Sequence, residues 1–200
     1  MKQTVLTVEN VIKRFPGTVA LKGVSFELHA QEILALAGEN GAGKSTLMKI
    51  LSGIYPHREY EGKITLNGKE CQFTGTAMAE NAGIAMIYQE LNMELDLSVA
   101  ENIVLGKYPR TKWGSIDWKQ VREEAEKTLG QVGLHLDTGT IVRNLNPSMQ
   151  QLVSIARALY RKPRVLILDE PTSVLTEREA QKLMEIIRKL KNDGISCIYI

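Results

Sequence analysis

The sequence is poor in cysteine and has no long apolar run. Its two cysteines, Cys71 and Cys197, are too few and too far apart for a disulfide framework or a cysteine-rich metal site, so we expect two buried, reduced thiols. The longest apolar run, residues 33–37, is about five residues long, whereas a membrane span needs about 20. If this protein works at a membrane, another chain therefore does the spanning.

An excess of one charge is also missing. The 25 lysines and arginines and the 23 aspartates and glutamates leave a formal charge of +2. This balance gives little support to a broad basic face for nucleic acid, and we expect no nucleic-acid partner. Residues 1–11 contain no apolar signal-peptide core, so we expect a cytoplasmic protein.

The composition, 44% hydrophobic and 24% charged, is that of a globular protein. The apolar patterns along the chain predict strands that alternate with helices. Alternating apolar residues predict half-buried antiparallel strands at 4–15 and 23–29, and the short run at 33–37 predicts a strand buried on both faces. The same patterns predict further strands at 63–66, 84–88, 165–168 and 195–200, and helices at 99–105, 118–132, 152–159 and 176–190, with one more ending before Gly53. Asn67-Gly68 predicts a hairpin turn after the strand at 63–66. Ser98 with Glu101 and Thr176 with Glu179 predict helix caps, and Trp118 is expected on the apolar face of its helix.

This order of elements predicts an α/β fold with an inserted lobe. Strands that alternate with helices imply a mostly parallel sheet covered on both faces. Residues 91–160 read as almost entirely helical, so we expect them to form a separate lobe in a core made of residues 1–90 and 161–200. The last predicted strand runs to the end of the sequence, from which we expect a fragment of a longer protein.

A phosphate-binding motif follows the strand at 33–37. The eight residues from Gly38 to Ser45 match Walker A, Gly-x-x-x-x-Gly-Lys-Ser, at the end of a strand and the start of a helix. A chance match of the four fixed positions in a chain of this length has a probability of about 0.01. Glycines let backbone amides surround a phosphate, Lys44 reaches the β- and γ-phosphates, and the Ser45 hydroxyl ligates Mg²⁺. The expected nucleotide-binding residues are Gly38, Glu39, Asn40, Gly41, Ala42, Gly43, Lys44, Ser45 and Thr46.

Two carboxylates follow the apolar strand at 165–168. Asp169 is placed to bind Mg²⁺ directly or through water, and Glu170 to polarise the attacking water as general base. An apolar strand that ends in acids is weak evidence alone, because strands commonly end at charged turns. Together with Walker A, the pair predicts a magnesium nucleotide site.

These motifs resemble the nucleotide-binding domain of ABC transporters, a P-loop NTPase fold with an N-terminal antiparallel β part and an inserted helical lobe. The resemblance covers essentially the whole chain and implies two more site residues. Gln89, after the strand at 84–88, corresponds to the Q-loop residue that touches Mg²⁺ and water and relays nucleotide state to the membrane partner. Phe15 corresponds to the aromatic residue that stacks on adenine, although an ordinary core residue is the alternative.

The same resemblance identifies the segments that contact an opposing ATPase domain. Residues 169–176 resemble the run from Walker B into the D-loop. The family signature, Leu-Ser-Gly-Gly-Gln, has its counterpart at 145–149, and it departs from the family pattern at Asn146, Pro147, Ser148 and Met149. We therefore expect this half of the signature chemistry to be altered.

Finer features resemble the first ATPase half of bacterial monosaccharide importers of the xylose, ribose and galactose type. They lie at 39–40, 53–57, 89–91, 99–103 with 105–106, and 172–176. The resemblance implies ATP and Mg²⁺ as ligands, and a second ATPase domain in a head-to-tail sandwich, fused in the same polypeptide. It also implies a membrane permease, indirectly a periplasmic sugar-binding protein, and a peripheral position on the cytoplasmic face of the inner membrane.

Other readings of the sequence stay open. A non-transport ABC ATPase, such as a translation factor or DNA-repair motor, would be favoured by long coiled-coil insertions or a strongly basic lobe, and the sequence has neither. A P-loop kinase or GTPase offers no place for Gln89 and the helical lobe. The third reading is a nucleotide-binding regulatory half without turnover. The family's switch histidine would follow the last strand, and this sequence ends before that position.

Overall fold

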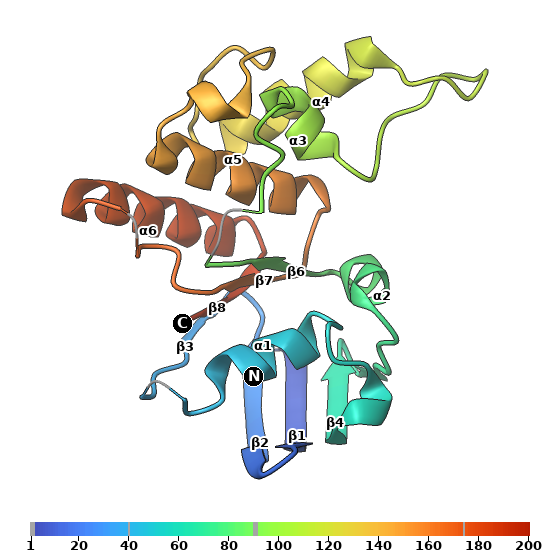
Figure 1. Cartoon of the computed structure of the whole chain (residues 1–200), viewed down its shortest axis with the longest axis vertical. Coiled ribbons are helices and arrows are strands. Elements are labelled where there is room, and N and C mark those ends of the chain that lie inside the picture. Colours follow the sequence, from blue (N-terminus) through green and yellow to red (C-terminus); the bar gives the residue numbers. More distant parts are fainter. Residues whose placement is uncertain (1–2, 40, 90–91, 174) are drawn as a thin grey trace. The chain divides into compact units, whose positions relative to one another are not determined.

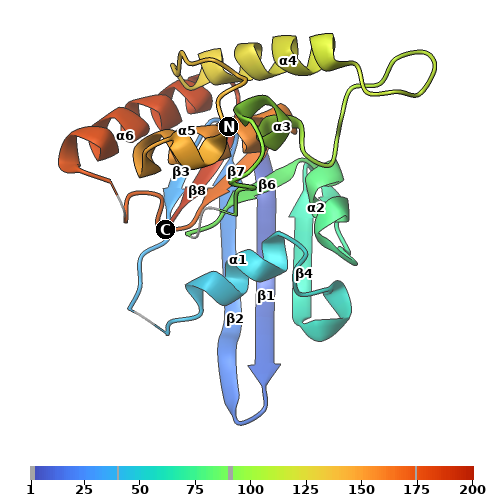
Figure 2. The same cartoon turned by 45° about the horizontal axis from the view of Figure 1, so that its top comes forward.

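The computed structural model describes residues 3–39, 41–89, 92–173 and 175–200 (Figures 1 and 2). The residues form two compact units. The first comprises Met1–Met86, Pro163–Glu170 and Ile187–Ile200, and the second comprises Ile87–Lys162 and Pro171–Ile186. Four residues from the motifs quoted above lie outside the described residues: Asn40, Glu90, Leu91 and Val174.

An antiparallel sheet forms one part of the first unit, with strand order β2-β1-β4-β5. β1 (Thr4–Phe15) pairs with β2 (Thr18–His29) and with β4 (Glu61–Leu66). β2 begins five residues before its predicted start because the hairpin pairing continues to Phe15 and Thr18. Asn67 and Gly68, both at positive φ, turn β4 into the short β5 (Lys69–Glu70), which confirms the predicted hairpin turn.

The other sheet has the order β3-β8-β7-β6. Its strands are β3 (Ile33–Ala35), β6 (Ile84–Ile87), β7 (Val165–Leu168) and β8 (Ser196–Tyr199), and β8 pairs in parallel with β3 and β7. Every residue of β7 is buried. The prediction that β3 is buried on both faces is wrong: Ile33 and Leu34 are half-buried and Ala35 is exposed. In the described part of the chain β3 has one strand neighbour, so its other edge lies open.

Two helices belong to the first unit. α1 (Lys44–Leu51) lies against β2 and buries four apolar side chains, those of Leu47, Met48, Ile50 and Leu51. α2 (Thr76–Ala82) has no counterpart among the predicted elements, because it buries one residue, Ala79, and its sequence carries no apolar stripe. Both cysteines are free; Cys197 is buried as predicted, whereas Cys71 is half-buried because it follows the short edge strand β5.

Three helices pack against one another in the second unit: α3 (Val99–Val104), α4 (Trp118–Gln131) and α5 (Pro147–Tyr160). Ser98 and Glu101 form the predicted capping box at α3. α5 begins five residues before its predicted start because the Asn146 side chain caps it, accepting from the Met149 amide at 2.8 Å. Long loops separate the helices, so residues 91–160 are less helical than predicted.

The prediction that Trp118 lies on the buried face of α4 is wrong. Trp118 is the first residue of that helix, is 47% exposed, and rests edge-on against Tyr108 with ring centroids 6.4 Å apart. α6 (Glu177–Asn192) has the predicted cap, since the Thr176 amide donates to the Glu179 carboxylate at 2.9 Å. In the described residues, no helix combines the length and apolar character needed to cross a membrane.

Asn102 is a fully buried polar residue of α3. Its side-chain oxygen accepts from the Glu94 amide at 2.9 Å. Its side-chain nitrogen donates to the carbonyls of Glu94, Ser98 and Leu97 at 2.9, 3.1 and 3.4 Å. The irregular segment before α3 is therefore bonded to the helix through one side chain.

Candidate functional site

The loop between β3 and α1 is shaped by glycines in the left-handed region. Gly41 has φ +85° and Gly43 has φ +90°. A Cβ atom on Gly43 would lie 2.4 Å from the carbonyl oxygen of Ala20 and 2.8 Å from the Leu21 side chain. Glycine is therefore required at Gly43 both by its dihedral angle and by the close approach of β2.

Lys44 is the first residue of α1, and its ammonium group turns back over the loop. Its Nζ atom donates to the carbonyl oxygens of Gly38 and Glu39, the second at 3.1 Å. The amide of Ala42 donates to the Glu39 carbonyl at 3.1 Å, which closes the loop on itself. The ammonium group and the amides of the first turn of α1 thus contribute positive potential beside the loop.

A cavity of about 200 Å³ opens beside this loop. It brings residues of Walker A together with the two carboxylates that follow β7, which lie more than 120 positions later in the sequence. The lining residues are Ala20, Glu39, Gly41, Gly43, Lys44, Ser45, Thr46, Asp169, Glu170 and Ile200. One cationic residue, two hydroxyl residues and three acidic residues, two of them Asp169 and Glu170, therefore line one space.

The two carboxylates stand in different surroundings. Glu170 has φ +43°, and its amide donates to the Ile200 carbonyl at 3.2 Å. Burial, with repulsion from Glu170, raises the pKa of Asp169, and Lys44 and Lys49 oppose that rise. A carboxylate that is poorly solvated and lies beside another negative charge is stabilised in its ionised form by a bound cation.

The residues at the cavity fit Mg²⁺ held jointly with a phosphate. The Ser45 hydroxyl and the Asp169 carboxylate are hard oxygen donors, the type that Mg²⁺ prefers. Within the described ranges no group of three or more His, Cys, Asp or Glu side chains could hold a metal ion alone. A site with few protein ligands suits Mg²⁺ because this ion usually keeps waters and binds substrate phosphates.

Several predicted site residues lie away from the cavity lining. Gly38 and Ala42 belong to the loop but act through their backbone groups. Phe15 ends β1 and is half-buried against Tyr55, with ring centroids 5.6 Å apart. Gln89 lies after β6 and belongs to the second unit. The contact of Gln89 with Mg²⁺ and the contact of Phe15 with adenine both stay predictions. Asn40 lies outside the described residues.

The segment that departs from the family signature forms the start of α5. Ser148 hydrogen-bonds Glu179 of α6, and the Thr176 backbone amide, the Thr176 hydroxyl and Ser148 together lower the pKa of the Glu179 carboxyl group. Sequence reasoning missed this link, because Ser148 and Glu179 are brought together by the fold. A cavity of about 210 Å³ lies beside them; it is lined by Leu134, Asn146, Ser148, Met149, Gln151, Leu152, Leu175, Glu179, Lys182 and Leu183.

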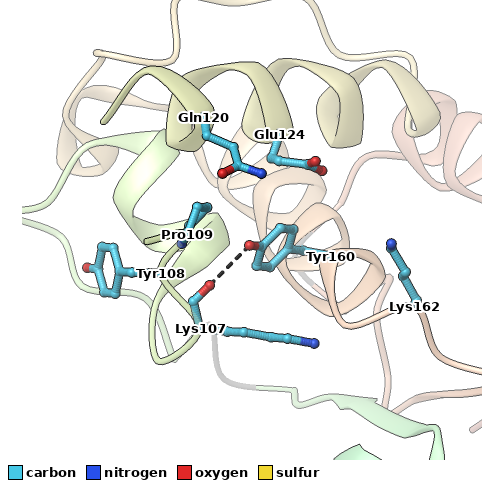
Figure 3. Close-up of a pocket in the computed structure, with 7 residues that line it drawn as sticks. All are labelled: Lys107, Tyr108, Pro109, Gln120, Glu124, Tyr160 and Lys162. Carbon is cyan, nitrogen blue, oxygen red and sulfur yellow. Dashed lines mark hydrogen bonds between the residues drawn. The ribbon is translucent and has the colours of Figure 1, made fainter. Parts of the chain in front are cut away.

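A further cavity of about 270 Å³ lies in the second unit, and sequence reasoning gave no sign of it (Figure 3). The Tyr160 hydroxyl donates to the Lys107 carbonyl at 3.0 Å, and Gln120 and Glu124 enter from α4. Burial raises the pKa of Tyr160, with a smaller contribution from Glu124. The lining residues are Lys107, Tyr108, Pro109, Gln120, Glu124, Tyr160 and Lys162.

Comparison with known proteins agrees with this architecture. A family model described as ABC transporter matches residues 21–173. Over its whole length the chain is 50% identical to the xylose import ATP-binding protein XylG of Moorella thermoacetica and 48% to the ribose import ATP-binding protein RbsA 2 of Rubrobacter xylanophilus. It is also 44% identical to the L-arabinose transport ATP-binding protein AraG of Geobacillus stearothermophilus. The chain covers 40%, 38% and 39% of these relatives, respectively.

Solved structures show the same fold. An ATP-binding cassette of an ABC transporter in its ADP conformation matches with a TM-score of 0.85 and 27% identity, over 98% of this chain and 80% of that one. A nucleotide-free cassette matches with a TM-score of 0.87 and 26% identity, over 98% of this chain and 81% of that one. The predicted fold, a P-loop ABC ATPase core, is thereby confirmed. With a family model matched over residues 21–173 and relatives up to 50% identical, the chain belongs to the ABC transporter family.

Proposed function

We propose that the cavity beside the Gly38–Ser45 loop binds ATP with Mg²⁺ and that this chain contributes to ATP hydrolysis. The observation that carries the proposal is the convergence of Lys44, Ser45, Asp169 and Glu170 on one cavity. Each has the chemistry that a triphosphate needs: a cation for the β- and γ-phosphates, oxygen ligands for the metal, and a carboxylate for the attacking water.

The proposed reaction is an in-line attack of water on the γ-phosphate. Lys44 and the amides at the start of α1 bind the phosphates and stabilise the charge of the transition state. Ser45 and Asp169 hold Mg²⁺, which neutralises charge on the phosphate oxygens when it is bound. Glu170 orients the water and accepts its proton, and Gln89 and Phe15 keep the roles that the family resemblance implies for them.

We further propose that hydrolysis powers the import of a monosaccharide through a membrane permease. Relatives 44–50% identical to this chain are named for xylose, ribose and L-arabinose transport, which supports this class of cargo. In this proposal the chain forms a head-to-tail sandwich with a second ATPase domain. It works at the cytoplasmic face of the inner membrane, and a periplasmic sugar-binding protein delivers the sugar.

Uptake of labelled sugars tests the transport proposal. Cells that encode the protein, with the chromosomal Lys44→Ala substitution, are supplied separately with xylose, ribose, L-arabinose, galactose and glucose. We expect uptake of one of these sugars, or of a small subset, to fall to the level of a deletion strain. Normal uptake of every sugar, together with ATP hydrolysis by the purified protein, would instead favour a non-transport ABC ATPase.

A further inference from the structure

Lys13 is the one charged residue that is buried in the described part of the chain. It lies on β1, two positions before Phe15, and is 4% exposed. A buried ammonium group is tolerated when it is paired and its hydrogen bonds are satisfied. The contacts of the Lys13 ammonium group therefore identify the residues that it connects.

The partners of Lys13 lie in the segment that follows α1. Its Nζ atom donates to the backbone carbonyl of Glu59 at 2.8 Å and to the Glu59 carboxylate at 2.9 Å. The same atom lies 4.5 Å from the centre of the Tyr55 ring and 5.1 Å from the centre of the Phe15 ring. The ammonium group thus connects the end of β1 to the segment 55–59 through two hydrogen bonds and two ring contacts.

This segment is itself tied to the helix that begins at the phosphate loop. The Tyr55 amide donates to the carbonyl of Lys49, in the last turn of α1, at 3.0 Å. Tyr55 then meets Phe15 edge-on, with ring centroids 5.6 Å apart and an interplanar angle of 65°. Contacts therefore run without a break from α1 through Tyr55 and Lys13 to Phe15.

We propose that Lys13 is a positioning residue for nucleotide binding, which fixes the Phe15 ring relative to α1 so that the ring can stack on the purine base. The inference rests on the proposed ATP site and adds Lys13, Tyr55 and Glu59 to it. Phe15 remains half-buried, so part of its ring is accessible to a flat base. Holding the ring in one orientation before binding lowers the entropic cost of stacking.

The test compares two ligands that differ in the base. Equilibrium binding of MgATP and of magnesium tripolyphosphate, which has phosphates but no base, is measured on purified protein by calorimetry. We expect Lys13→Met to weaken MgATP binding about tenfold, as for the loss of one aromatic contact, and to leave tripolyphosphate binding unchanged. Lys13→Arg retains the charge and is expected to recover most of the affinity.

Two further variants separate positioning from a role in folding. Phe15→Leu is expected to lower the affinity for MgATP as much as Lys13→Met does. The double variant is expected to lower it no further, because both residues act through one ring. If Lys13→Met lowers the melting temperature too far for binding work, Glu59→Gln weakens the same link more mildly. Glu59→Gln is then expected to show the same loss for MgATP alone.

The outcomes distinguish failure of the inference from failure of the proposed function. If the unmodified protein binds neither MgATP nor tripolyphosphate, the proposed nucleotide site is wrong. If it binds both, and Lys13→Met weakens both equally or neither, Lys13 serves the fold alone and the inference is overturned.

Discussion

The Cα atom of Gly43 faces the carbonyl oxygen of Ala20 so closely that a Cβ atom would lie 2.4 Å from it. The strand β2 therefore lies directly against the phosphate loop at Gly43. We expect Gly43→Ala to lower the free energy of unfolding by about 2–4 kcal/mol and to displace the loop, since both the clash and the positive φ oppose a side chain. Urea denaturation measures the loss.

Gly41→Ala is the matched control for that substitution. Gly41 also has positive φ, but no atom lies within 4 Å of a Cβ placed there. Gly41→Ala is therefore expected to lower the free energy of unfolding only through its positive φ, by about 1–2 kcal/mol. Equal losses for the two variants would show that the contact with Ala20 is unimportant.

Lys44→Ala removes the ammonium group at the cavity. We expect affinity for a fluorescent ATP analogue to fall at least about 100-fold, because the phosphates lose their charge-assisted hydrogen bonds. Lys49→Ala, which removes the same charge from an exposed position of α1, is expected to change affinity little. Unchanged binding in Lys44→Ala would refute the assignment of the phosphate loop.

Asp169→Asn is expected to stabilise the protein in the absence of nucleotide and Mg²⁺. Burial and Glu170 raise the pKa of Asp169 in the folded state above its ordinary value of 3.8, so its ionised form opposes folding. This penalty is complete above the raised folded-state pKa and disappears as the pH falls below the unfolded value. Thermal melts at pH 7 are expected to show a higher melting temperature for Asp169→Asn, and the gain is expected to vanish near pH 3.

The control for this pH dependence is Asp193→Asn, at an exposed aspartate after α6, where no such gain is expected. The stabilised Asp169→Asn protein is nevertheless expected to lose the Mg²⁺ dependence of ATP binding. A lower melting temperature at pH 7 would show that the Asp169 carboxylate stabilises the fold.

Glu170→Gln is expected to retain ATP binding and to hydrolyse ATP at least about 100-fold more slowly in the protein that contains both proposed ATPase halves. Glutamine keeps the shape of the side chain and removes the base. Single-turnover hydrolysis measures the chemical step. A rate equal to that of the unmodified protein would make Glu170 a structural residue.

The altered signature predicts unequal ATP sites in the proposed sandwich. In this arrangement the Lys44 site is completed by the signature of the second half, whereas Asn146, Pro147 and Ser148 face the second half's phosphate loop. Ser148 adds a side chain where a close backbone approach is wanted, and Pro147 removes a donor. Lys44→Ala is therefore expected to abolish nearly all turnover, while the matching substitution in the second half leaves a substantial fraction. Equal losses would contradict the asymmetry.

Local patterns predicted the parts of the molecule that depend on neighbouring residues. The loop from Gly38 to Ser45 and the capping pairs at α3 and α6 are of this kind. The burial of β3 was misjudged because burial depends on strand neighbours far away in the sequence. The link between Ser148 and Glu179, and the contacts of Lys13 with Tyr55, depend on packing between distant segments and left no periodic signal.

The four hydrogen bonds of Asn102 have a mechanical consequence for the stretch before α3. Residues 93–97 lack a regular backbone ladder, yet the Asn102 side chain bonds two of their carbonyls, those of Glu94 and Leu97, and one amide, that of Glu94. We therefore expect this stretch and α3 to move together when either of them is displaced. Replacing Asn102 by an apolar residue of similar size, such as leucine, would remove these hydrogen bonds and let the stretch move independently of α3.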